Sequence, residues 1–300
     1  MRSFTRRDFL RTAIGTAACV SGGAPLVRAY DLAAPLGFQA HGLRVLLSAD
    51  FPGTLKKVKA LGYDQVELVS FKGYSGNSSR DGFAALAPMD PSKIREIVSD
   101  SGLAAPSCHF KFTEFQDDVI DSTIEWAHGV GVKHMVVVDL PAMNTADDCK
   151  AIFDNVNRFA ERVVNAGLEL GHHTQPDDWK IIDGRLVMDQ FLENTDARHC
   201  QMELDLESTM TMGMDGADYL QKHPERFFAL HLRDAKTPAT TGKYLNSLPL
   251  GEGDIDWKQM LQAAKSAHVA MYFVEMEMAG SGDPLNALKI SADYIHSLSV

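Results

Sequence analysis

Four apolar runs of the sequence finish with side chains that commonly bind metal ions. These side chains are His173, Asp205, His231 and Glu275. Two imidazoles and two carboxylates form a donor set that suits one divalent ion. Each residue alone could instead cap a helix or bond to the backbone. Four buried polar groups without partners at one place would be costly, so their joint occurrence predicts a shared metal site.

Further polar residues lie close to these positions and could handle a substrate. Glu67 and His109 end two other apolar runs, and each could bind a substrate hydroxyl, take part in proton transfer or be structural. Arg233 could bind an anionic or hydroxylated group, or simply be solvated. Asp234 could orient a metal ligand or cap the next segment. Glu277 shares a strand face with the last predicted ligand and is a candidate for substrate binding nearer the solvent.

These side chains need a scaffold of short buried strands separated by helices. The predicted strands cover residues 36–39, 65–69, 105–110, 134–138, 168–173, 201–206, 227–232 and 271–277. The predicted helices cover residues 54–61, 91–101, 119–130, 146–166, 219–223, 257–267 and 284–297. Eight strands that alternate with helices predict an α/β protein, a (β/α)8 TIM barrel that forms a single domain over residues 36–300.

Glycines between the predicted helices and strands agree with this organisation. Gly62, Gly102, Gly131 and Gly167 each follow a helical pattern and precede a strand, as glycines at helix C-termini do. The alternative fold is a doubly wound open sheet. That fold would be expected to carry a Gly-rich nucleotide-binding loop after its first strand, and the sequence has none there.

The first 29 residues resemble an export signal. Arg6 and Arg7 precede an uncharged stretch, residues 12–27, that is too short and too rich in Gly and Ala to span a bilayer stably. The paired arginines resemble a twin-arginine signal, which predicts a periplasmic protein exported by that route, with no stable membrane span. The alternatives are an ordinary secretory signal, a basic tail, or a lipid anchor on Cys19.

Charge and cysteine content narrow the possible partners. The net charge is −11, and loss of residues 1–29, with five arginines and one aspartate, would bring it to about −15. Such an acidic surface argues against nucleic acid and anionic membranes as partners. Cys108, Cys149 and Cys200 would remain in the exported chain. Their odd number and lack of CxxC spacing indicate neither a disulfide framework nor a four-cysteine zinc site.

Several short stretches resemble one family of barrels. They are residues 37–39, 53–58, 62–67, 106–109, 230–234, 249–257, Glu275 and residues 283–285. In this order they resemble the sugar phosphate isomerase/epimerase family of xylose-isomerase-like TIM barrels, from about residue 36 to the C-terminus. The resemblance is specific for the superfamily and says little about the substrate.

The resemblance implies one divalent metal ion at the C-terminal end of the barrel. The ion is most often Mn²⁺, with Co²⁺, Zn²⁺ or Mg²⁺ as alternatives. Carried over position by position, its ligands are His173, Asp205, His231 and Glu275. Strand alternation allows either His172 or His173 to face the site, and the family register favours His173.

This chain departs from the family pattern near the fifth strand. The epimerase branch typically has Glu where this chain has His173. A closer branch carries a His-Asn-His triplet there, with Glu three residues further on, where this chain has Thr174, Gln175 and Asp178. An aromatic residue of that branch is Ser208 here. These departures imply a rebuilt pocket, in which Asp178 is a candidate for substrate binding.

Three functions are consistent with these residues. The first is isomerisation or epimerisation of a sugar through proton abstraction next to a carbonyl and a metal-stabilised enediolate. Glu275 is the expected base, and the second base is sought among Glu67, His109 and Asp178. The second function is β-elimination on a 3-keto-glycoside, with His109 or His173 as the acid, and export favours it. The third is a sugar-binding barrel without catalysis. The partner is then a small sugar or keto-glycoside, and a homo-oligomer stays open.

Overall fold

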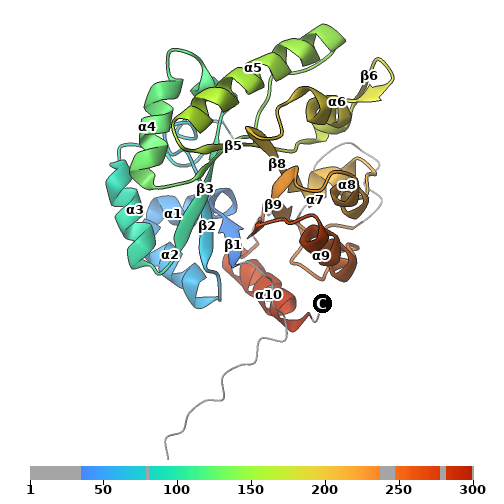
Figure 1. The fold of residues 1–300 in the computed structure, drawn as a ribbon. Coiled ribbons are helices and arrows are strands. Elements are labelled where there is room, and N and C mark those ends of the chain that lie inside the picture. The colour runs from blue at the N-terminus through green and yellow to red at the C-terminus, as the bar shows by residue number, and fades with distance from the viewer. Residues whose placement is uncertain (1–34, 79–80, 237–246, 278–281, 299–300) are drawn as a thin grey trace, which may run out of the picture.

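Eight parallel strands form a closed barrel that helices surround (Figure 1). The structure is a computed structural model that describes residues 35–78, 81–236, 247–277 and 282–298. The predicted twin-arginine signal, residues 1–29, lies outside the described residues, as does Cys19.

The strands follow one another around the barrel in the order β1, β10, β9, β8, β5, β4, β3, β2. They are β1 (Leu36–Gln39), β2 (Gln65–Val69), β3 (Ala104–Phe110), β4 (His134–Val137), β5 (Glu169–His173), β8 (Cys200–Asp205), β9 (Phe227–Leu232) and β10 (Met271–Val274). The predicted TIM barrel is therefore confirmed. The largest difference in bounds is at β10, because its regular pairing with β9 ends at Val274 and not at residue 277.

Ten α-helices are present in the described residues. They are α1 (Arg44–Ala49), α2 (Phe51–Ala60), α3 (Pro91–Asp100), α4 (Ile120–Val130), α5 (Ala146–Asn165), α6 (Val187–Asn194), α7 (Leu206–Thr211), α8 (Gly216–Lys222), α9 (Trp257–Ser266) and α10 (Pro284–Ser297). The predictions missed α1, α6 and α7, which have eight residues or fewer and show too little periodicity. They also missed a hairpin between β5 and α6, formed by β6 (Ile181–Ile182) and β7 (Arg185–Leu186).

Aspartates and glycines set many of the helix ends. Asp side chains at positions 50, 90, 215, 256 and 283 accept hydrogen bonds from the first backbone N–H groups of α2, α3, α8, α9 and α10. Gly62, Gly102, Gly131 and Gly167 follow α2, α3, α4 and α5 with φ between 76° and 100°. Those left-handed conformations confirm the predicted helix-ending glycines and return the chain to the next strand.

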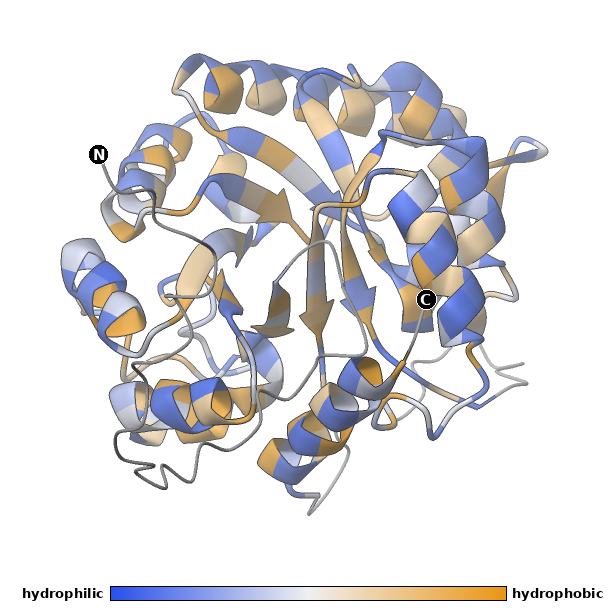
Figure 2. Cartoon of the chain, turned by 60° about the horizontal axis from the view of Figure 1, so that its bottom comes forward, coloured by the Kyte–Doolittle hydropathy of each residue, from blue (hydrophilic) through white to orange (hydrophobic). Residues whose placement is uncertain are grey.

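The helices turn their hydrophobic sides toward the barrel (Figure 2). The core between the two layers includes Leu55, Ile94, Phe153 and Ala264 from four different helices, all buried. None of the described helices is both long enough and apolar enough to cross a membrane. The sequence indicates no disulfide framework. In the structure Cys108, Cys149 and Cys200 are free and buried. The outer layer is thus an apolar support, whereas the polar groups gather inside the barrel.

Candidate metal centre at the barrel mouth

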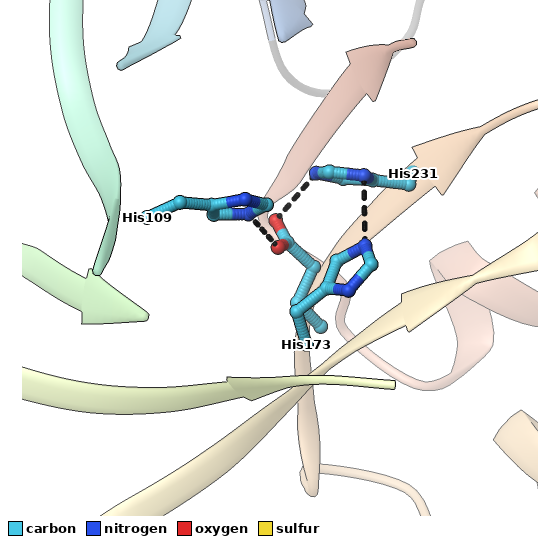
Figure 3. A group of neighbouring side chains, drawn as sticks. His109, His173 and His231 are labelled. Carbon is cyan, nitrogen blue, oxygen red and sulfur yellow. Dashed lines mark hydrogen bonds and ion pairs between the residues drawn. The ribbon is translucent and has the colours of Figure 1, made fainter. Parts of the chain in front are cut away.

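The four predicted ligands come together at the C-terminal end of the barrel. His173 ends β5, Asp205 ends β8, His231 is the penultimate residue of β9, and Glu275 directly follows β10. One donor atom of each lies within 4.8 Å of the donor atoms of the others, and all four residues are buried. Figure 3 shows the rings of His173 and His231 turned toward each other inside the barrel. We call these four side chains the donor group.

The separations within the donor group suit a single ion. His173 Nε2 lies 3.0 Å from His231 Nδ1 and 3.7 Å from Asp205 Oδ2. His231 Nδ1 lies 3.0 Å from Glu275 Oε2 and 3.9 Å from Asp205 Oδ2. Atoms bound about 2.1 Å from one ion lie roughly 3 to 3.5 Å from one another in octahedral or tetrahedral geometry. The donor group could therefore hold a metal ion without a large rearrangement.

Three of the four donors have the protonation state that a bound cation requires. Burial would raise the pKa of Asp205 and of Glu275, but Arg233 and the neighbouring imidazoles together outweigh burial and hold both pKa values below their usual range. Burial lowers the pKa of His173, and His231 beside it lowers that pKa further. Metal ligands must be anionic carboxylates and neutral imidazoles. Asp205, Glu275 and His173 already have those forms. Burial would lower the pKa of His231, but Glu203 and Glu67 outweigh burial and raise that pKa well above its usual range, so an ion would have to displace a proton from this ring.

A second group of polar side chains lies next to the donor group, and two of its members, Glu67 and Glu203, are fully buried inside the barrel. Glu67 accepts hydrogen bonds from Ser107 Oγ at 2.5 Å and from His231 Nε2 at 2.6 Å. His109 Nε2 lies 2.7 Å from Glu203 Oε2 and 2.9 Å from Glu67 Oε2. Glu203 Oε1 lies 3.2 Å from His231 Nε2. We call Glu67, His109 and Glu203 the inner layer, and His231 connects it to the donor group.

The inner layer joins strands from opposite sides of the barrel. β2 and β8 are four positions apart in the strand order, as are β3 and β9. Glu67 and Glu203 therefore approach each other from opposite walls, and so do His109 and His231, whose rings stack with centroids 5.1 Å apart. Burial would lower the pKa of His109, but Glu67 and Glu203 outweigh burial and raise that pKa to about 9.

Arg233 is surrounded by carboxylates at the wall of the site. Its guanidinium lies 3.3 Å from Asp205 Oδ2, 3.0 Å from Glu275 Oε2, 2.5 Å from Glu207 Oε2 and 3.7 Å from Glu277 Oε2. The side chain is 3% exposed. Its charge thus offsets part of the acidity of the donor group, and its contacts with substrate would be limited to the edge that lines the cavity.

A cavity opens between the donor group and the solvent. It is lined by His41, Val69, Tyr74, His109, Val138, His173, Gln175, Arg233, Glu275 and Glu277. His41 Nδ1 lies 2.6 Å from Glu277 Oε1, and Gln175 Nε2 lies 3.0 Å from His173 Nδ1. The structure therefore brings the predicted residues His109, Arg233, Glu275 and Glu277 to one cavity. Glu67 is fully buried beneath it, in the inner layer.

The neighbouring residues His172 and Asp178 lie outside this cavity. The ring of His172 packs against Phe191 of α6, with centroids 5.0 Å apart, and its Nδ1 lies 3.1 Å from Val137 O. Asp178 Oδ2 lies 3.0 Å from His172 Nε2 and accepts the backbone N–H of Gln175 at 2.7 Å. Strand alternation directs His173 inward and His172 outward. The contacts of Asp178 are therefore with His172 and the backbone of Gln175, and its contact with substrate stays a prediction.

Asp234 fixes the loop that follows β9. Its carboxylate accepts the backbone N–H groups of Ala235 at 3.0 Å and Gly251 at 2.9 Å, and the indole N–H of Trp257 at 2.9 Å. Of the two roles open from the sequence, capping the next segment is the one that these contacts show. Among the described residues, none of these contacts joins Asp234 to the donor group.

Sequence reasoning missed several polar residues of the site. Glu203 carried a usable signal, because it lies two residues before Asp205 and strand alternation places both on one face. His41, Gln175 and Glu207 lie in segments that follow strand ends, where no periodicity indicates direction. Gln39, whose amide Nε2 lies 3.2 Å from His109 Nδ1, ends β1 in the same manner as the predicted ligands end their strands.

Known proteins share this architecture. A protein-family model described as the xylose isomerase-like TIM barrel matches residues 55–298. A sugar phosphate isomerase/epimerase from Parabacteroides distasonis ATCC 8503 is 21% identical, with a TM-score of 0.73 over 88% of this chain and 96% of that one. An L-ribulose 3-epimerase is 14% identical, with a TM-score of 0.65 over 87% and 93%. The IOLI protein, whose structure contains a zinc atom, is 14% identical, with a TM-score of 0.63 over 88% and 95%.

At these identities the solved structures show a shared fold. No curated protein matches the chain. The family model, in contrast, spans the chain from α2 to α10 and includes every residue of the donor group. Because the matched region covers most of the sequence, the chain belongs to the xylose isomerase-like TIM barrel family.

Proposed function

We propose that this protein is a divalent-metal-dependent sugar isomerase or epimerase. The observation that carries the proposal is the donor group, in which two imidazoles and two carboxylates from four strands lie within 4.8 Å of one another. The relatives named as sugar phosphate isomerase/epimerase and L-ribulose 3-epimerase support a sugar as substrate. The zinc atom in the structure of the IOLI protein supports a bound metal ion in this protein as well.

The residues of the cavity have distinct parts in this reaction. A divalent ion held by the donor group would supply Lewis-acid polarisation of a sugar carbonyl. Glu275 lines the cavity and is the base for the proton on the adjacent carbon. His109 reaches the cavity from β3 and would bind a hydroxyl or return the proton. Arg233 holds Glu275 in its anionic form, which is the form that accepts a proton.

A second candidate function is β-elimination on a 3-keto-glycoside. The observation in its favour is the distribution of acid–base groups around the cavity. The lining carboxylates, Glu275 and Glu277, follow β10, whereas β3 and β5 contribute the imidazoles of His109 and His173. Elimination needs one base and an acid for the leaving group, and such a cavity offers a carboxylate and an imidazole.

Compartment and metal identity belong to the same proposal. The paired Arg6 and Arg7 support export to the periplasm by the twin-arginine route, where a glycoside is a more accessible substrate than a sugar phosphate. Manganese is the ion that we propose, with cobalt, zinc and magnesium as the ions to compare. A mixed set of imidazoles and carboxylates can bind each of these ions.

The test begins with metal content. Purified wild-type protein and the His231→Ala variant are loaded with Mn²⁺, desalted and measured by mass spectrometry of the metals. We expect about one ion per chain in the wild type, as the single donor group implies, and a strong loss in the variant. No ion in the wild type after loading with any of the four metals would overturn the proposal.

The reaction is then identified from products. Keto sugars, aldoses and 3-keto-glycosides are incubated with the loaded protein in D₂O and followed by NMR. An inverted stereocentre or an aldose–ketose conversion supports the isomerase or epimerase. A released aglycone with an unsaturated or hydrated sugar supports the elimination instead. Binding of sugars without turnover over the whole panel would support a non-catalytic sugar-binding barrel.

A further inference from the structure

The two ring nitrogens of His231 serve two different groups of residues. Nδ1 faces the donor group, at 3.0 Å from both His173 Nε2 and Glu275 Oε2. Nε2 faces the inner layer, at 2.6 Å from Glu67 Oε2 and 3.2 Å from Glu203 Oε1. His231 is fully buried. Figure 3 shows its ring next to those of both His109 and His173.

Glu67 and Glu203, the carboxylates beneath His231, have few hydrogen-bond partners besides this ring. Apart from its contact with His231 Nε2, Glu203 Oε1 has no hydrogen-bond partner among the described residues. Its other oxygen bonds His109, and Glu67 bonds His109, Ser107 and His231. Carboxylates accept hydrogen bonds and cannot donate them. By this rule both ring nitrogens of His231 carry a proton in the metal-free protein, because Nδ1 faces Glu275 and Nε2 faces Glu67. An ion in the donor group would replace the proton on Nδ1, whereas Nε2 would still face two carboxylates and keep its proton.

Gln39 determines how His109 takes part in this arrangement. Gln39 Oε1 accepts the backbone N–H of His41, which fixes the orientation of the amide. Its Nε2 therefore donates to His109 Nδ1 at 3.2 Å. A neutral His109 accepts this N–H at Nδ1. In either protonation state its Nε2 carries a proton, because Nε2 faces the carboxylates of Glu203 and Glu67. Each carboxylate is thereby held on one side by His109 and faces His231 on the other.

Burial of the charged side chains of the inner layer costs free energy, and folding alone does not require it. The interior of such barrels is usually filled by branched apolar side chains. Two fully buried carboxylates lose several kcal/mol each of hydration, and ion pairs often only offset that loss. Apolar residues at Glu67 and Glu203 would serve stability as well. Retention of both charges next to a metal-ligating ring therefore points to a role toward that ring.

We infer that Glu67 and Glu203 are positioning residues that keep the proton of His231 on Nε2 and so present the lone pair of Nδ1 to the metal ion. The inference rests on the proposed function, because it assumes an ion in the donor group. It moves Glu67 from the predicted substrate contacts to a place behind a ligand, and it adds Glu203 to the site. Carboxylates that accept the second N–H of a metal-bound histidine orient the ring and raise its basicity.

The inner layer could alternatively hold a second ion, since His109, His173, Glu203 and His231 also have donor atoms within 4.8 Å of one another. The distances within the inner layer favour hydrogen bonds over a shared metal ion. The contacts of His109 Nε2 with Glu203 and Glu67, at 2.7 and 2.9 Å, have the lengths of charge-assisted hydrogen bonds. Atoms that share one ion lie farther apart, at roughly 3 to 3.5 Å.

The first test measures metal affinity. The dissociation constant for Co²⁺ is determined by competition with a chelator for the wild type, Glu67→Gln and Glu203→Gln. The matched control is Glu114→Gln, which removes a carboxylate that binds Ser70 and the backbone of Lys111 outside the site. We expect Co²⁺ affinity to fall roughly 10- to 100-fold in the two inner-layer variants and to stay unchanged in the control.

The second test reads the tautomer directly in wild-type protein and uses a variant only to assign the signals. Long-range ¹H–¹⁵N NMR of the Zn²⁺-loaded protein, with the His231→Asn spectrum for assignment, should show a protonated Nε2 and an unprotonated Nδ1 for His231. A proton on Nδ1 would overturn the inference.

The outcomes separate the inference from the proposed function. Wild-type protein that binds no metal would overturn the function. Normal binding in the wild type with unchanged affinity in both inner-layer variants would overturn only the positioning role. Two ions per chain in the wild type, with one lost in Glu203→Gln, would overturn it in favour of an inner metal site.

Discussion

His173 Nε2 and His231 Nδ1 lie 3.0 Å apart inside the barrel, on residues 58 positions apart in the chain. They belong to β5 and β9, which are separated by β8 in the strand order. Neither β5 nor β9 alone would bring two imidazole nitrogens together. The closed barrel does so because adjacent parallel strands end at the same rim. Substitutions of these two histidines therefore test the candidate metal site without altering the strands that form the barrel.

The adjacent histidines of β5 provide a matched pair of substitutions. His173→Ala removes a donor atom and should lower the bound metal well below that of the wild type. His172→Ala removes a ring that contacts Phe191 and Asp178 on the outer side of the strand. It should reduce the free energy of unfolding by roughly 1 to 3 kcal/mol and leave the metal content unchanged. Metal analysis together with urea denaturation checks both. Equal loss of metal in the two variants would contradict the assignment of His173.

The barrel was predictable from the sequence for physical reasons. Strands buried on both faces are continuous apolar runs, such as 227–232, and they do not require long-range information to be seen. Glycines such as Gly131 mark the return of the chain, since only they adopt φ near 90° without strain. The short helices and the short hairpin were not predicted. α7 has six residues and begins at the N-cap Asp205, which is itself in the donor group.

The candidate site was only partly predictable. Side chains at strand ends, such as His231 and Glu275, are found from the end of an apolar run. The partners of a buried charge are not found in this way, because they come from distant strands. Thus Glu67 was expected near substrate, and only the closed barrel reveals that it pairs with His231, 164 positions away. Asp178 was carried over by family position, and its contact with His172 depends on the outward direction of one ring.

Arg233→Met tests the charge balance of the donor group. Loss of the guanidinium leaves Asp205, Glu275 and Glu207 buried without their cation, and should reduce the free energy of unfolding of the metal-free protein by about 3 kcal/mol. A bound ion would then be the main counter-charge. Saturating Co²⁺ should therefore stabilise the variant more than it stabilises the wild type. Denaturation with and without Co²⁺ measures this difference, and an equal gain in both proteins would show that Arg233 does not balance the site.

Asp234→Asn separates loop stability from metal binding. The amide would replace one carboxylate oxygen, so that the donors of that oxygen lose their acceptor. Gly251 N–H and the Trp257 indole share Oδ2, whereas the N–H groups of Ala235 and Ile255 bond Oδ1. Each unpaired buried donor costs roughly 1 to 3 kcal/mol, and thermal unfolding should shift accordingly while metal content stays at the wild-type value. Trp257→Phe in the variant should cost less than in the wild type, because the two residues form one hydrogen bond. Additive costs or a loss of metal would argue for a different role of Asp234.

The pair of Lys111 and Asp81 predicts how stability depends on acid. Lys111 Nζ lies 2.8 Å from Asp81 Oδ1 and 4.9 Å from the ring centre of Tyr74, which lines the cavity. The hydrogen bond from Lys111 lowers the pKa of Asp81 from 3.8 to about 2. A carboxyl whose folded pKa is depressed stabilises the protein above pH 3.8 and loses that contribution as the pH falls through about 2.

Asp81→Asn should therefore be less stable than the wild type near pH 5, and the difference should shrink toward pH 2. Urea denaturation across that range measures it. Lys111→Met should show the same trend, because Lys111 is the main cause of the shift, whereas a difference that stays constant with pH would mean that Asp81 keeps an ordinary pKa in the folded protein.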